Sequence, residues 1–151
     1  MKRHVLVGIA VMALTWVGCV RAPMPPLDLA GPGWQTQEAA ALWTPGRGAA
    51  ELAGELLMAD RGGPDTLVQF SKQGIPLVTA RTDAMGWEIR SSLRKGRTTG
   101  RGRPPERVLW FQLMRAELAP DWARVDLGDG RWRLENRGTG ERMEIHPLEG
   151  L

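Results

Sequence analysis

Residues 87–94 read WEIRSSLR, a run in which apolar and polar side chains largely alternate. In an extended backbone Trp87 and Ile89 point to one face, whereas Glu88 and Arg90 point to the other. A strand with one apolar and one charged face is typical of an antiparallel sheet that covers a core on one side and meets water on the other. This segment therefore predicts an antiparallel sheet.

The same period of two recurs on both sides of this strand, and turn-forming Gly, Pro, Asp and Asn residues separate the repeats. We count about seven or more antiparallel strands. The other alternating segments are residues 52–58, 66–72, 75–81, 124–127, 131–135 and 142–146.

Three segments carry other signals. Residues 49–58 fit either a strand or a helix, and residues 37–42 fit a short helix. Residues 95–104 are rich in Gly and Arg, and we expect them to form a loop.

One segment has the length of a helix. Pro105 and Glu106 suit a helix start, and the apolar run that follows ends near Leu118, before Pro120. On a helical projection its apolar side chains go nearly all the way round, so such a helix must be covered on several sides. The sequence thus predicts an α+β fold, in which a curved antiparallel sheet, or half-barrel, wraps around one main helix.

The N-terminus has the layout of a secretory signal. A basic start at Lys2 and Arg3 precedes a 13-residue apolar run, residues 5–17, which is too short to span a bilayer. Gly18 and Cys19 follow, and Cys19 is the one cysteine of the chain. This arrangement resembles the lipobox of bacterial lipoproteins, with Trp16 where that pattern usually has Leu.

The resemblance implies cleavage before Cys19 and acylation of its thiol. It divides the chain into a signal peptide, residues 1–18, a lipidated Cys with a Pro-rich tether, residues 19–33, and a periplasmic domain, residues 34–151. Several acyl chains hold a protein far more firmly than one does. The resemblance thus implies a lipid anchor in the bacterial cell envelope, and we expect it in the outer membrane, with the domain facing the periplasm.

Charge is concentrated in one stretch. The chain carries a formal charge of +3, and cleavage would remove Lys2 and Arg3 and leave about +1. Residues 90–107 are strongly basic, and Arg97, Arg101 and Arg103 are candidates for contact with an anionic surface. Residues 101–104, RGRP, also match the core of an AT-hook. We expect no nucleic-acid partner, because an exported lipoprotein does not meet chromosomal DNA.

The strand order, the segment 104–118 and the ending WRLEN, residues 132–136, followed by TGE, residues 139–141, resemble the periplasmic lipoprotein-carrier superfamily typified by LolA and LolB. The resemblance covers roughly residues 50–147 and implies an incomplete barrel over a hydrophobic cavity. LolB-type receptors carry a protruding apolar loop residue, and Met85 is the candidate for that part.

The resemblance implies a function in which a lipid or lipoprotein acyl chain is bound or passed on without covalent chemistry. The alternative is a structural envelope lipoprotein that docks a partner protein through its sheet or its Arg-rich loop. The candidate cavity residues are the apolar side chains expected to point inward: Phe70, Trp87, Ile89, Trp110, Leu113, Trp132 and Leu134.

Signals for catalysis are poor. His146 is the one histidine beyond the signal peptide, and no nucleophile-elbow pattern surrounds any serine. No His, Asp and Glu residues have metal-ligand spacing, and no Gly-rich phosphate loop follows a strand. We therefore expect a protein that is not an enzyme and that uses no metal and no cofactor.

Overall fold

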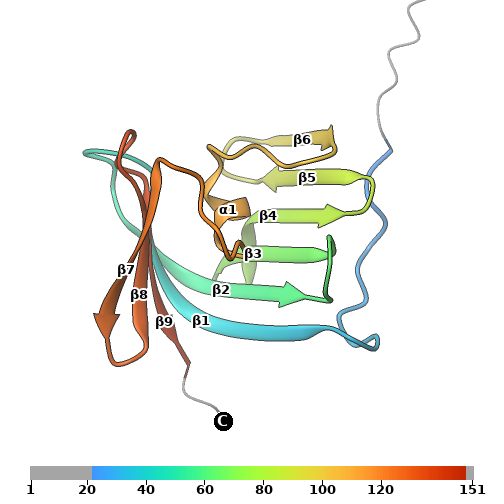
Figure 1. Ribbon diagram of the computed structural model, residues 1–151, viewed down its shortest axis with the longest axis horizontal. Helices are drawn as coiled ribbons and strands as arrows, with labels where there is room; N and C mark the ends of the chain where they lie inside the picture. Colours follow the sequence, from blue (N-terminus) through green and yellow to red (C-terminus); the bar gives the residue numbers. More distant parts are fainter. Residues whose placement is uncertain (1–21, 149–151) are drawn as a thin grey trace, which may run out of the picture.

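The computed structural model describes residues 22–148. The signal peptide predicted for residues 1–18 and the lipidation predicted at Cys19 lie outside the described residues. The described part of the chain forms one sheet of nine antiparallel strands, in the order β6-β5-β4-β3-β2-β1-β9-β8-β7 (Figure 1). The strands are β1 (Gln35–Thr44), β2 (Leu52–Asp60), β3 (Thr66–Lys72), β4 (Ile75–Asp83), β5 (Gly86–Ser91), β6 (Gly96–Arg101), β7 (Trp122–Gly128), β8 (Arg131–Asn136) and β9 (Arg142–Pro147).

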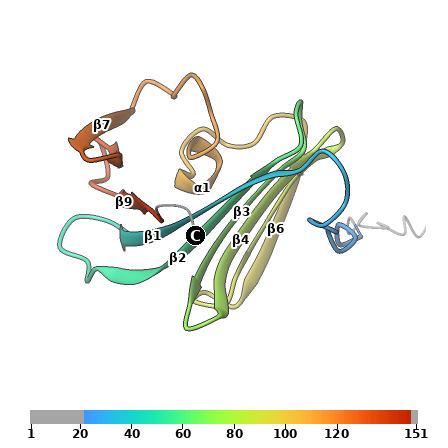
Figure 2. The same ribbon diagram turned by 90° about the horizontal axis from the view of Figure 1, so that it is seen from below.

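Strand β1 lies in the middle of the sheet and joins its two parts. It pairs with β2 along nearly its whole length and with β9 from Ala39 to Thr44. Figure 1 shows that β7, β8 and β9 stand steeply to the other strands, so the sheet curves around a concave face. Residues 102–121, here called the plug segment, lie on that face, and Figure 2 shows residues 22–33 on the opposite side of the sheet.

The predicted α+β fold with one main helix is wrong, because the fold is nearly all β. The plug segment contains only a four-residue helix, α1 (Leu109–Gln112). Its N-cap residue, Val108, offers no side-chain hydrogen bond to the first turn, and Pro104 and Pro105 stand just before it. The apolar side chains on all sides of this segment pack in the core, because the curved sheet covers the segment on several sides.

Two local predictions are also wrong. Residues 37–42, expected to be helical, lie inside β1, and residues 95–104, expected to form a loop, contain β6. Strand β6 shows no apolar alternation because its inward positions, opposite Ile89 and Trp87, are Thr98 and Gly100. A Cβ at Gly100 would overlap the indole of Trp87, so glycine leaves the space in which that ring packs. The open choice for residues 49–58 is resolved as strand β2.

The core lies between the concave face and the plug segment. At its centre Trp110 of α1 meets Trp43 of β1 edge to face, with ring centroids 4.9 Å apart, and Phe70 of β3 lies 5.9 Å from each. Such aromatic pairs add stabilisation beyond the area they bury. Gly54 of β2 makes room for them, since a Cβ there would come within 2.8 Å of the Phe70 ring.

Residues 22–33, the described part of the tether, form neither helix nor strand. Figures 1 and 2 show that they cross the convex face of the sheet near the turn between β4 and β5. Met24 is buried there. The tether thus lies against the domain in its described part.

Candidate functional site

The plug segment is fixed by hydrogen bonds that close it on itself. Gln112 is fully buried; its Nε2 donates to the Glu106 carbonyl at 2.9 Å, and its Oε1 accepts from the Ala119 amide at 3.1 Å. The indole N–H of Trp122, at the start of β7, donates to the same Glu106 carbonyl at 2.9 Å. These bonds satisfy the buried polar groups of an irregular backbone, so the segment packs as a defined part of the core.

The seven residues predicted to line a cavity do not together line one open space. Phe70, Trp110, Leu113 and Leu134 are buried in the core. The other three, Trp87, Ile89 and Trp132, are partly buried against it. The plug segment occupies the concave face that an open carrier would leave empty, and two pockets lie beside the plug.

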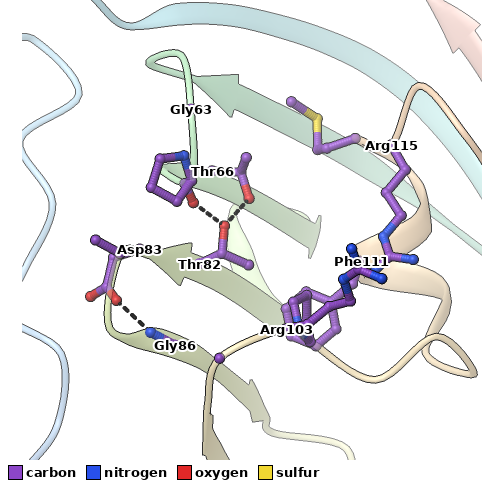
Figure 3. A pocket seen from close by; sticks show the side chains of 13 residues that line it. Gly63, Thr66, Thr82, Asp83, Gly86, Arg103, Phe111 and Arg115 are labelled. Atoms are coloured by element: carbon purple, nitrogen blue, oxygen red, sulfur yellow. Dashed lines mark hydrogen bonds between the residues drawn. The ribbon is translucent and has the colours of Figure 1, made fainter.

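The larger space beside it is a pocket of about 410 Å³ between the plug segment and the ends of β3, β4 and β5 (Figure 3). This volume falls within the range of small-molecule sites. Phe111, Met114 and Pro104 give it apolar surface from the plug segment, and Pro64 and Ala84 add to it from the opposite turns.

Two arginines give the pocket positive charge. Figure 3 shows the side chains of Arg103 and Arg115 reaching the same side of the pocket, beside Phe111. Arg115 is mostly buried, and its Nη1 lies 3.7 Å from Glu106 Oε1. Arg103 forms no ion pair with another residue in the described range 22–148. A guanidinium beside an apolar floor is suited to a ligand that has a carboxylate or phosphate and a hydrocarbon part.

The opposite wall is polar and held by turns. The hydroxyls of Thr66 and Thr82 lie 2.7 Å apart on neighbouring strands, and the Thr82 hydroxyl also donates to the Pro64 carbonyl (Figure 3). Asp83 Oδ1 accepts from the amides of Met85 and Gly86 at 2.7 and 2.9 Å, which shapes the turn between β4 and β5. The rim on this side is therefore preformed.

A second pocket, of about 320 Å³, lies on the other side of α1. Ile89 and Trp110, two of the predicted cavity residues, contribute to it together with Trp43, Arg94 and Glu141. The Trp43 indole donates to Glu141 Oε1 at 3.2 Å. Burial raises the pKa of Glu141, while that hydrogen bond and the charge of Arg94 act in the opposite direction. Arg94 and Arg107 line this pocket together with one carboxylate, as Arg103 and Arg115 line the larger pocket together with Asp83, so the two pockets differ in volume rather than in their set of charges.

Trp132 is not a wall of either pocket. The guanidinium of Arg124, on the neighbouring strand β7, lies 4.1 Å from the centre of the Trp132 ring, which is a cation–π contact. One face of the Trp132 indole is therefore covered by a charged side chain.

The three candidate arginines are separated by the fold. Arg97 and Arg101 lie on β6, and the Arg97 guanidinium is 3.3 Å from Glu88 on the convex face, whereas Arg103 lines the larger pocket. Met85 is exposed at 72% in the turn between β4 and β5, beside residues that line the same pocket. Sequence reasoning missed Arg115, Met114 and Phe111 as pocket residues. An Arg at the end of an apolar run was the signal for the first of these.

Metal-ligand groups and membrane-spanning helices can be assessed for the described part of the chain. Residues 22–148 contain no group of three or more His, Cys, Asp or Glu side chains placed to hold a metal ion. His146 Nε2 lies 2.9 Å from Glu144 Oε1 on β9. No helix within this range has the length and apolar character needed to span a membrane. No protein-family model and no curated protein matches this chain.

Proposed function

We propose that this protein is an outer-membrane lipoprotein, facing the periplasm, whose domain binds the acyl chain of an anionic amphiphile without covalent chemistry. The pocket of about 410 Å³ carries the proposal, because it combines apolar surface with two arginines on one side. Fatty acids, acidic phospholipids and acylated peptides with a free carboxylate share the chemistry that fits it.

Each part of such a ligand has a physical match in the pocket. Burial of a methylene contributes about 0.8 kcal/mol, so Phe111 and Met114 favour the chain over the headgroup. A charge-assisted hydrogen bond contributes about 1.5 to 3 kcal/mol, so Arg103 and Arg115 favour an anionic head over a neutral one. The pocket is smaller than a complete phospholipid needs, so we propose that one chain enters and the rest stays outside.

The test uses the mature chain with Cys19→Ser, which cannot be acylated. Native mass spectrometry and titration with palmitate and with hexadecanol, its neutral counterpart, measure uptake and the effect of the head. We expect palmitate to bind more tightly, and Arg103→Ala to weaken palmitate about tenfold while leaving hexadecanol unchanged. Arg101→Ala is the matched control, because Arg101 is exposed and does not line the pocket.

A chain that takes up neither ligand contradicts the proposal and favours the alternative, a structural envelope lipoprotein that docks a partner protein. The observation behind that alternative is the filled concave face, where the plug segment packs against Phe70 and Trp43. Equal palmitate affinities for Arg103→Ala and Arg101→Ala would refute the assigned headgroup contact alone.

A further inference from the structure

The convex face of the sheet carries a buried row of side chains near the turn between β4 and β5. Strand pairing aligns Ala59, Leu67, Arg81 and Glu88 across β2, β3, β4 and β5. Ala59, Leu67 and Glu88 are buried although they point away from the core. Figure 2 shows the tether, residues 22–33, on this face.

Polar contacts hold the tether in place. Glu88 is only 2% exposed, and its Oε2 accepts from the backbone amide of Met24 at 3.3 Å. Arg90 and Arg97 pair with the same carboxylate at 2.9 and 3.3 Å, which compensates for its burial. The Arg81 guanidinium donates to the Pro25 carbonyl at 2.6 Å. The tether is thus bound at Met24 and Pro25 by both a carboxylate and a guanidinium.

This contact limits how far the domain can lie from an anchor at Cys19. Five residue steps separate Met24 from Cys19, and a fully extended chain spans at most about 3.6 Å per residue, or roughly 18 Å. Met24 contacts Glu88, which lies two residues after Gly86, the first residue of β5. The docked part of the tether is therefore close to the turn between β4 and β5. The far end of β4, at Ile75, lies eight positions from Asp83, or about 26 Å along the strand.

We propose that the docked tether holds the β4–β5 turn against the bilayer that carries the anchor, so that the larger pocket opens toward that membrane. Met85, an apolar side chain exposed at 72%, then meets the membrane interface. Asp83, Ala84 and Gly86 of the same turn line the pocket, so its ligand comes from the anchoring membrane itself. This inference rests on the lipid anchor of the proposed function.

The experiment uses the acylated mature protein in vesicles of phosphatidylethanolamine and phosphatidylglycerol. Acylation occupies the one native cysteine, so a single new cysteine takes a polarity-sensitive fluorophore cleanly. Met85→Cys is compared with Ile75→Cys, which is similarly exposed, at 63%, at the other end of β4. We expect a blue shift on vesicles and quenching by a lipid-borne quencher at position 85 and neither at position 75.

A second variant tests whether the tether sets this orientation. Insertion of 12 Gly and Ser residues between Arg21 and Ala22 keeps the contacts of Met24 and Pro25 and adds a root-mean-square reach of about 20 Å. We expect the membrane signal at position 85 to fall at least severalfold in this variant. An unchanged signal, or equal signals at positions 75 and 85, overturns the proposed orientation. An unacylated Cys19 removes the anchor on which the inference rests and therefore also overturns it. Palmitate binding by the Cys19→Ser chain is measured independently of both results.

Discussion

Replacement of Trp110 by Ala tests whether the plug segment is part of the core or a lid that leaves it. Trp110 is buried and packs edge to face on Trp43 at 4.9 Å and against Phe70 at 5.9 Å. Truncation of a buried Trp to Ala costs about 3 to 5 kcal/mol, which combines lost burial with the cavity left behind. The loss of two aromatic contacts places this site at the upper end of that range.

Such a loss is a large part of the total stability, since domains unfold with a free energy of about 5 to 15 kcal/mol. For a loss of about 5 kcal/mol and a urea dependence of about 2 kcal/mol per molar, the unfolding midpoint should fall by about 2.5 M. Circular dichroism in the far ultraviolet follows the transition without relying on tryptophan emission. Leu93→Ala is the control, because Leu93 is 47% exposed and its truncation should cost no more than about 0.5 kcal/mol.

The result that refutes this reasoning is a midpoint lowered by less than about 0.5 M with an unchanged slope. The plug segment would then contribute little to folding and would be free to leave the concave face. In that case the residues predicted from the sequence to line a cavity, including Phe70 and Leu134, would become accessible to a ligand after all.

Three further predictions concern single side chains. Gly100→Ala should destabilise the domain by about 1 to 3 kcal/mol, because the new methyl overlaps Trp87, whereas Gly96→Ala on the same strand should fold normally; urea midpoints compare them. Gln112→Ala should cost about 1 to 3 kcal/mol by leaving the Ala119 amide without its acceptor, and increased amide exchange at Ala119 should accompany the loss. Burial raises the pKa of Glu141 above its ordinary value of 4.5. Between these two pKa values the folded chain holds a proton that the unfolded chain has released. The free energy of unfolding should therefore fall as the pH rises from 4.5 through the raised pKa. Glu141→Gln should remove that decrease; equal pH dependences of unfolding in the variant and the parent chain would contradict it.

The alternation of apolar and polar residues correctly predicted which side chains of a strand point to the core, wherever the inward positions are apolar. Trp87 and Ile89 on β5, and Met143 and Ile145 on β9, point to the core side of the sheet. Strand β6 escaped prediction because its inward positions are Thr98 and Gly100, which are defined by backbone pairing and by the space under a neighbouring indole. A glycine at an inward position, such as Gly100, adds no apolar side chain to the alternating pattern, so the pattern does not reveal the strand.

The helix was overpredicted for a related reason. A long apolar run after Pro105 favours a helix when only neighbours in sequence are considered. In the fold, Gln112 and Trp122 supply tertiary hydrogen bonds to the Glu106 carbonyl, and these replace helical ones. The larger pocket was beyond sequence reasoning because its walls come from separate turns and from the plug segment, which only the closed sheet brings together.

The central place of β1 has a consequence for the order of folding. Its partner β2 follows at once along the chain, but its other partner, β9, arrives last: Ala41 pairs with Ile145, 104 residues later. Pairings so distant in sequence slow folding, because loop closure precedes the contacts that reward it. Until the last strand is in place, β1 presents an open edge that other chains can extend. Pairing of residues 142–147 with β1 is therefore the step that closes this edge.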